Sequence, residues 1–215
     1  MTIFESSVAL VGSLRVLFVM AAAAEYGAQL QARIDPLMCG VGPVEAAIST
    51  TATLAALAHA KLLPNLVFSL GSAGSRTLER AGIFQVSSVC YRDMDASPLG
   101  FERGMTPFAD HCAVIAIPQR IQGIASASLS TGASVISGEG YDQIETEMVD
   151  MECFAVLRAA QRYGIPTIGL RGISDGRTEL SRIEDWSHGL SLIDERLAAG
   201  IDLFESQVRD GRFTL

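Results

Sequence analysis

The chain has 215 residues, of which 49% are hydrophobic and 19% charged, so it is too apolar to be disordered and long enough for one folded domain over residues 1–215. Its formal net charge of −8 argues against a nucleic-acid partner, because phosphate backbones attract positive charge. The four cysteines form no C-x-x-C pair and the three histidines have no metal-ligand spacing, so neither a disulfide framework nor a metal site is expected.

The apolar segment over residues 8–24 resembles a membrane or signal segment at first sight. Arg15 interrupts it, and the uninterrupted part over residues 16–24 is shorter than the roughly 20 residues that a spanning helix needs. The leading residues carry Glu5 and no positive charge, unlike a secretory signal peptide. We therefore expect a cytoplasmic protein without a membrane partner.

Strand-like and helix-like segments alternate along the chain. Strands are expected at residues 15–20, 65–70, 82–91, 111–117, 148–151 and 167–173, and helices at residues 43–61, 152–163 and 190–208. Residues 133–137 lead to Gly138 and a polar turn. The last helix has apolar residues at steps of three and four, and its solvated face should carry Asp194, Glu195, Asp202 and Glu205. This alternation predicts an α/β fold whose sheet is covered by helices on both faces.

Polar residues follow several of the predicted strands directly. Glu25 comes after the first strand, residues 71–74 after the second, and Glu152 and Asp175 after the last two. Each of these residues alone is also explained by a helix cap or an ordinary turn. Because ligands of α/β proteins bind beyond the carboxyl ends of strands, their joint placement predicts a ligand site there.

Three common site motifs are absent or incomplete. Gly40-Val-Gly42 begins like a dinucleotide fingerprint, but Glu45 stands where the third glycine belongs and no strand immediately precedes the motif. Residues 71–74 are not followed by Gly-Lys-Ser/Thr, so they are no P-loop, and the chain has no G-x-S-x-G nucleophile motif. We expect no cofactor.

The remaining motifs occur in a recognisable order. They are Gly-Val-Gly at 40–42, Gly-Ser-Ala-Gly at 71–74, Tyr-Arg-Asp-Met-Asp at 91–95, residues 100–107, Ser-Gly-Glu-Gly-Tyr at 137–141, Met-Glu at 151–152, and Arg-Gly-Ile-Ser-Asp at 171–175. This order resembles the 5'-methylthioadenosine/S-adenosylhomocysteine nucleosidases of the nucleoside phosphorylase/hydrolase superfamily. The resemblance implies a three-layer αβα domain with a central twisted mixed sheet. It also implies hydrolysis of the N-glycosidic bond of either nucleoside, releasing adenine and the 5-thio-ribose product, by a homodimer without a cofactor.

The resemblance also assigns roles to individual residues. It makes Asp175 the carboxyl that protonates or hydrogen-bonds the leaving purine, and Glu25 the base that activates water near Arg171. The other positions that it assigns to substrate binding are Ser72, Ala73, Gly74, Leu99, Pro107, Tyr141, Asp142, Met151, Glu152 and Ser174. Within this set, Glu152 would take the sugar hydroxyls and Tyr141 would stack on adenine. Leu99 and Pro107 would reach the alkylthio pocket of the neighbouring subunit.

The chemistry agrees with these roles. Cleaving an N-glycosidic bond benefits from one carboxyl that donates a proton and a second that activates water, as in inverting glycosidases. The donor must keep its proton near neutral pH, so we predict that partial burial raises the pKa of Asp175.

Other activities remain open. Related phosphorylases hold phosphate with an arginine just before the glycine motif, where this chain has Ser69, so water is favoured over phosphate, although Arg76 lies nearby. Ala22 stands where the family commonly has a methionine, and the segment between Glu25 and Gly40 is shorter than usual. A phosphate-dependent purine nucleoside phosphorylase, a nucleoside-binding homologue without the base, and a different nucleosidase acting on nucleotides or futalosine-like compounds are therefore the alternatives.

Overall fold

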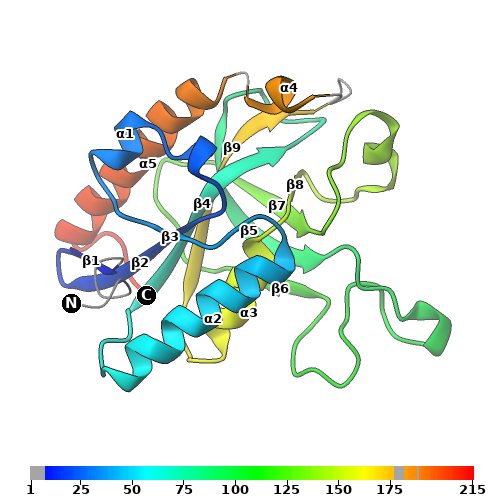
Figure 1. The fold of residues 1–215 in the computed structure, drawn as a ribbon, viewed down its shortest axis with the longest axis horizontal. Helices are drawn as coiled ribbons and strands as arrows, with labels where there is room; N and C mark the ends of the chain where they lie inside the picture. The colour runs from blue at the N-terminus through cyan, green and yellow to red at the C-terminus, as the bar shows by residue number, and fades with distance from the viewer. Residues whose placement is uncertain (1–7, 177–181, 188) are drawn as a thin grey trace.

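The computed structural model describes residues 8–176, 182–187 and 189–215 (Figure 1). Its strands are β1 (Val8–Val11), β2 (Leu14–Met20), β3 (Leu37–Met38), β4 (Leu66–Gly74), β5 (Ile83–Tyr91), β6 (Val114–Ala116), β7 (Ser126–Thr131), β8 (Met148–Asp150) and β9 (Thr167–Asp175). Its α-helices are α1 (Ala28–Gln31), α2 (Pro43–His59), α3 (Cys153–Gln161), α4 (Ile183–Ser187) and α5 (Leu190–Arg209). Its short 3₁₀ helices are η1 (Ala23–Glu25), η2 (Ser97–Leu99) and η3 (Gly138–Gln143).

The strands form one mixed sheet, and five of them close into a ring. β4 pairs parallel with β9, β9 antiparallel with β5, β5 parallel with β7, and β7 parallel with β8. The ring closes where Gly74 of β4 pairs with Val149 of β8. This closure brings the carboxyl ends of β4, β8 and β9 to one place.

Helices cover both faces of the sheet. α2 and α3 pack together on one face, and α1 and α5 lie on the other (Figure 1). Alternate residues of β2 serve the two layers: Leu17 packs with Val67 in the core under α2 and α3, while Phe18 joins the core under α5. There the Phe68 ring lies 5.5 Å from Phe18 and 5.1 Å from Phe204 of α5. The predicted three-layer α/β fold is confirmed.

Residues 71–74, expected to follow the strand as a glycine loop, are the last four residues of β4. They stay in the sheet because β9 runs beside them, with Ser72 opposite Gly172 and Ala73 opposite Ile173. Gly74 is required by space: a Cβ there would lie 2.1 Å from the Tyr141 hydroxyl oxygen and 2.7 Å from a carboxylate oxygen of Asp175. The glycine therefore lets two side chains meet against the backbone of β4.

One predicted strand is shorter in the structure, and three strands, β1, β3 and β7, were not predicted. The strand expected at residues 111–117 is shorter, covering only β6, and β7 was not expected at all. β7 has Ser or Thr at four of its six positions, which hides the pattern of its buried residues Ala127 and Leu129. Residues 133–137 lie beyond the end of β7, and η3 occupies the predicted polar turn.

Asp194 was expected on the solvated face of the last helix, and this was wrong. Its side chain is 5% exposed and accepts hydrogen bonds from the backbone N–H groups of Gln29 and Leu30, at 2.9 and 3.0 Å. These are free N–H groups in the first turn of α1, so a carboxylate of α5 caps another helix. Gly27, just before α1, leaves space for this carboxylate, since a Cβ there would lie 2.5 Å from an Asp194 oxygen.

Among the described residues, no helix is long and apolar enough to cross a membrane.

Candidate active site

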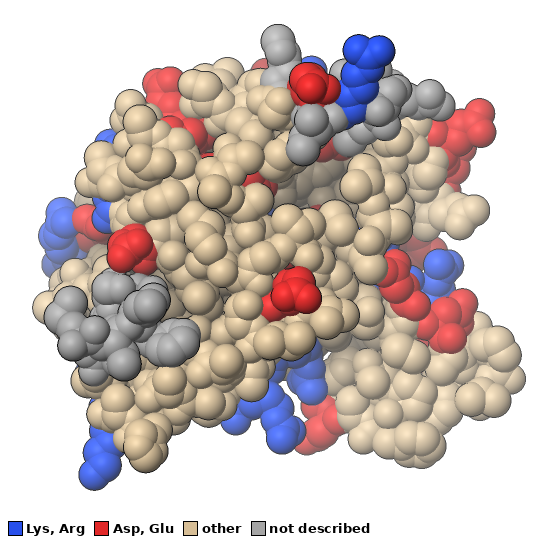
Figure 2. Space-filling model, viewed as in Figure 1, with Lys and Arg blue, Asp and Glu red and all other residues tan. Residues whose placement is uncertain are grey.

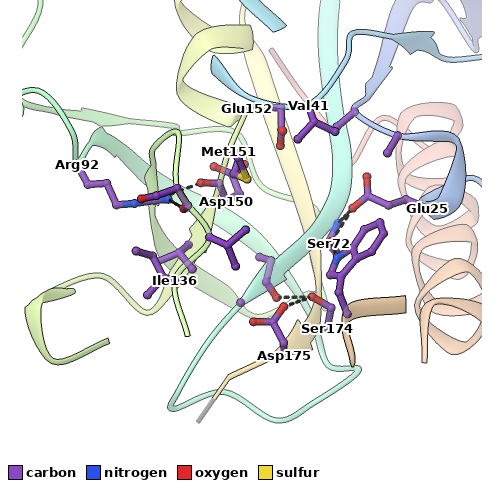
Figure 3. Close-up of a pocket in the computed structure, with 18 of the residues that line it drawn as sticks. Glu25, Val41, Ser72, Arg92, Ile136, Asp150, Met151, Glu152, Ser174 and Asp175 are labelled. Atoms are coloured by element: carbon purple, nitrogen blue, oxygen red, sulfur yellow. Dashed lines mark hydrogen bonds between the residues drawn. The ribbon is translucent and has the colours of Figure 1, made fainter. Parts of the chain in front are cut away.

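A pocket of about 540 Å³ opens at the carboxyl ends of β4, β8 and β9 (Figure 3). Pockets of this size suit a small organic molecule. Its lining residues are Ala21, Ala22, Glu25, Val41, Ser72, Ala73, Gly74, Arg92, Ser134, Val135, Ile136, Val149, Asp150, Met151, Glu152, Ser174, Asp175, Arg182 and Trp186. Eight of the predicted site residues thus come together here from distant parts of the sequence: Glu25, Ser72, Ala73, Gly74, Met151, Glu152, Ser174 and Asp175.

Glu25 lies on one side of this pocket, at the end of η1. The 3₁₀ turn after β2 forms because the Glu25 N–H donates to the Ala22 carbonyl at 3.1 Å. The carboxylate is 6% exposed, and its Oε1 accepts the Ser72 N–H at 2.7 Å and the Ser72 hydroxyl at 2.6 Å (Figure 3). Burial raises the pKa of Glu25, while the two Ser72 bonds and the charge of Arg171 oppose that rise.

Asp175 lies on another side, at the end of β9. Its two oxygens accept separate hydroxyl donors: Ser174 at 2.6 Å and Tyr141 at 3.3 Å. The side chain is half-buried, and this burial raises the pKa of Asp175 as predicted, against the lowering effect of both hydrogen bonds. The group therefore holds a proton at higher pH than an exposed aspartate.

Glu152 lies directly before α3, and only Met151 separates it from the end of β8. Its Oε1 accepts the backbone N–H of Gly42 at 2.8 Å, which ties the start of α2 to the pocket. Gly42 has a φ of 95°, a conformation that favours glycine. Burial and the neighbouring charge of Asp150 raise the pKa of Glu152 to about 7. Glu152 can therefore change its charge near neutral pH.

Arg171 is fully engaged by the protein. It lies in β9 with only 2% of its surface exposed, and it donates twice to Asp150, at 2.8 and 3.1 Å. Its other bonds go to the Ser69 hydroxyl at 2.9 Å and to the carbonyls of Ser69 and Leu170. All five guanidinium N–H groups are thereby used. Arg171 acts on the pocket through its positive charge, without lining it.

A second, water-sized hollow of about 10 Å³ lies behind the pocket. Glu25, Glu152 and Arg171 all line it, together with Ser69 and Cys39. Both glutamates and the arginine contribute to the wall of this hollow, whereas the larger pocket is lined by the two glutamates without Arg171. Among the described residues, no three His, Cys, Asp or Glu side chains are grouped so that they could hold a metal.

Four other predicted substrate-binding residues do not line the pocket. The Tyr141 side chain is buried with its hydroxyl on Asp175, so it is not placed to stack on a base in the pocket. Asp142 is exposed and pairs with Arg76 at 2.8 Å. Leu99, which is 78% exposed, and Pro107 lie in the segment after β5, away from the pocket walls.

Several lining residues were not predicted from the sequence, and five of them carry polar groups: Arg92, Ser134, Asp150, Arg182 and Trp186. Arg92 donates to the carbonyls of Ser130, Asp150 and Ser134 and so fixes the wall between β7 and η3. Its place within the Tyr-Arg-Asp-Met-Asp motif at 91–95 was a usable signal, and so was the position of Asp150 beside Met151. Trp186, the single tryptophan of the chain, had no such signal.

Comparisons with known proteins identify relatives of this chain. A profile of the phosphorylase superfamily matches residues 139–199, which include Glu152 and Asp175. The 5'-methylthioadenosine/S-adenosylhomocysteine nucleosidase of Haemophilus influenzae strain PittEE is 32% identical over 159 residues, covering 65% of this chain and 67% of the relative. The enzyme of the same name from Staphylococcus aureus strain MRSA252 is 26% identical over 163 residues, covering 66% of this chain and 69% of the relative.

Solved structures extend the likeness to the whole fold. An S-adenosylhomocysteine nucleosidase from Streptococcus pyogenes, in complex with 5-methylthiotubericidin, superposes with a TM-score of 0.75 at 19% identity, covering 94% of this chain and 99% of that one. A futalosine hydrolase mutant of Helicobacter pylori superposes with a TM-score of 0.71 at 16% identity, covering 91% and 98%.

Proposed function

The chain belongs to the family of the 5'-methylthioadenosine/S-adenosylhomocysteine nucleosidases, and from this premise we propose that it hydrolyses the N-glycosidic bond of one or both nucleosides, releasing adenine and a 5-thio-ribose. One observation supports this best: Glu25, Glu152 and Asp175 lie on three different sides of a single pocket and come from separate elements (Figure 3). This arrangement gives the pocket one carboxyl group for each requirement of the reaction.

Asp175 acts as the acid. Its raised pKa keeps a proton available at higher pH than usual, and that proton passes to a purine ring nitrogen as the bond between the base and the sugar breaks. The bonding electron pair leaves with the purine. The carboxylate that remains on Asp175 is stabilised by the hydroxyls of Ser174 and Tyr141, which donate to its two oxygens.

Glu25 acts as the base. Arg171 and the two Ser72 bonds favour its charged form in spite of burial, so it can accept a proton from a water molecule whose oxygen bonds to the anomeric carbon. The water-sized hollow between Glu25, Glu152 and Arg171 offers a place for that water. Glu152 and Met151 lie beside it on the pocket wall, where Glu152 can accept the sugar hydroxyls and favour the positive charge that develops on the ring.

The test is adenine release from 5'-methylthioadenosine in phosphate-free buffer, quantified by chromatography. We expect full turnover without phosphate and no sugar phosphate when phosphate is added. Ser69 supports this expectation: it lies where the phosphorylases carry a phosphate-binding arginine, and its hydroxyl is taken up by Arg171. Turnover only with phosphate would identify a phosphorylase, and adenosine binding without cleavage would identify a binding homologue.

We further propose that the active form is a homodimer in which Leu99 and Pro107 contact the partner subunit. Leu99 and Phe108 are 78% and 98% exposed, which is unusual for large apolar side chains. Val44 and Ile48 of α2 are also more than half exposed, and Figure 2 shows few charged side chains over that helix. A monodisperse monomer at micromolar concentration in analytical ultracentrifugation would contradict the dimer.

Two properties of the whole chain complete the proposal. We treat residues 1–215 as one domain, because a single sheet with one ring of paired strands joins elements from both ends of the described chain. We place the protein in the cytoplasm, because all four cysteines are free, as is usual in a reducing compartment.

A further inference from the structure

Trp186 is connected to Glu25 through a chain of two hydrogen bonds. The indole Nε1 donates to the Ser72 hydroxyl oxygen at 3.0 Å, and the same hydroxyl donates to Glu25 Oε1 at 2.6 Å. The three side chains come from α4, β4 and η1, which are far apart in the sequence. These two hydrogen bonds therefore join the pocket wall formed by α4 to the proposed base.

The number of available protons determines which group donates and which accepts in these two hydrogen bonds. An indole nitrogen can only donate, and a serine hydroxyl has a single hydrogen. Because the Ser72 oxygen already accepts the Trp186 N–H, its own hydrogen is directed at Glu25. The Ser72 backbone N–H reaches the same oxygen at 2.7 Å, so Oε1 receives two donors and the other oxygen, Oε2, lies beside Gly71.

From this geometry we propose that Trp186 is a positioning residue for Glu25, holding the Ser72 hydroxyl as a donor to the carboxylate and so fixing the orientation and charge of the base. The proposal rests on the proposed role of Glu25 in hydrolysis. Trp186 has a second contact role, since its half-buried ring packs against the main core and lines the pocket. A phenylalanine keeps most of that packing and removes only the N–H, which makes Trp186→Phe the informative variant.

Other charged and titratable groups face Glu25 and must be separated from this effect. Arg171 of β9 favours the charged form of Glu25, whereas Glu152 before α3 and the Cys39 thiol, when charged, oppose it. Asp194 of α5 lies near the same turn, where it caps α1. None of these groups bonds to Ser72 or Trp186 in the described structure, so none of them should respond to loss of the indole N–H.

The most direct experiment uses the chain's single tryptophan, whose indole N–H gives one signal in a ¹H–¹⁵N spectrum of the ¹⁵N-labelled protein. We expect this signal to shift with pH as Glu25 titrates. In Ser72→Ala it should move towards the position of a free indole and lose that pH response. In Glu25→Gln it should stay near its original position without the response. The same signal in Ser72→Ala as in the unaltered protein would overturn the proposal.

Kinetics give the second readout. In Trp186→Phe we expect the acidic limb of kcat/KM against pH to move to higher pH by about 0.5 unit, since a base that loses support for its anion is protonated more easily. Ser72→Ala should move it further, and Trp186→Phe added to Ser72→Ala should move it no more. Loss of packing alone would raise KM and leave the limb in place, and additive shifts would contradict action through Ser72.

The two proposals can fail separately. If the unaltered protein releases no adenine, the proposed function fails, while the indole signal still shows whether Trp186, Ser72 and Glu25 are linked. If adenine is released and the Trp186 indole signal is the same in Ser72→Ala as in the unaltered protein, only the positioning role fails. Circular dichroism spectra and melting temperatures of the variants exclude misfolding as the cause.

Discussion

Glu25 and Asp175 line the same pocket and are both withdrawn from water, yet they are surrounded differently. Glu25 is 6% exposed and lies near the positive charge of Arg171, with both of its Ser72 bonds on one oxygen. Asp175 is half-buried and has one hydroxyl donor on each oxygen. Burial raises the pKa of both carboxyls. The comparison teaches that burial alone does not separate the base from the acid, whereas the placement of the donors differs: both lie on one oxygen of Glu25, and one lies on each oxygen of Asp175.

Asp175→Asn should have the largest effect. The amide cannot supply the proton, so turnover should fall by about 10⁴-fold, at the upper end of what a general acid contributes. Steady-state adenine release measures the loss, and an unchanged melting temperature shows that the variant folds. Near-normal turnover would contradict the division of roles between Glu25 and Asp175, since Asp175 would then not be the acid.

Glu25→Gln should cost about 10²–10³-fold in kcat, because an amide cannot accept the proton of the attacking water. Ser72 can still donate to the amide oxygen, so the fold around η1 should remain. Binding of adenosine, measured by calorimetry, serves as the control and should change little. Unchanged turnover would show that Glu25 is not the base and would favour Glu152 in that role.

Glu152→Gln sharpens the comparison through stability. The pKa of Glu152 is about 7 in the folded protein, above the usual glutamate value of 4.5. The folded state is therefore favoured below pH 4.5 by the protonated group, and this advantage disappears as pH rises through 7. Between pH 5 and pH 8 we expect the free energy of unfolding to fall by about 1–3 kcal/mol. The melting temperature should fall by a few degrees as a result.

In Glu152→Gln this fall should be smaller, because glutamine does not titrate. Differential scanning calorimetry at the two pH values measures it, with Glu147→Gln, an exposed glutamate bonded to Ser128, as the matched variant. An identical fall in Glu152→Gln and in the unaltered protein would contradict the assignment.

Tyr141→Phe should have the smallest effect. Its 3.3 Å hydrogen bond lowers the pKa of Asp175, so removing the hydroxyl should raise that pKa and move the alkaline limb of the pH profile upward by a few tenths of a unit. Ser174→Ala should move the limb further in the same direction, because its bond is 2.6 Å long. A downward shift in either variant would mean that the hydroxyls stabilise the protonated acid instead.

The sheet and its main helices could be predicted because their apolar runs are long and their breaks are marked. Strands β2, β4, β5, β8 and β9 and helices α2, α3 and α5 lie where the sequence indicates them. β7 could not be found, since its alternating serines resemble a loop, and its strand pairs with β5 and β8 only in the folded chain.

The carboxylates of the site could be predicted, and their partners could not. Glu25, Glu152 and Asp175 lie at or shortly after the ends of strands, so local sequence places them at one edge. The burial of Asp194 depends instead on free N–H groups of α1, more than 160 positions away. Tyr141 was expected to stack on adenine, but its hydroxyl donates a hydrogen bond to Asp175, and both side chains lie against Gly74. No spacing in the sequence reveals this contact.

The pH dependence of kcat/KM for adenine release tests the division between base and acid most directly. The unaltered protein should give a bell, falling at low pH as Glu25 is protonated and at high pH as Asp175 loses its proton. The residual activity of Asp175→Asn should keep the acidic fall and lose the alkaline one. An alkaline fall at the same pH in Asp175→Asn would show that another group supplies the proton, and the account given for this pocket would be wrong.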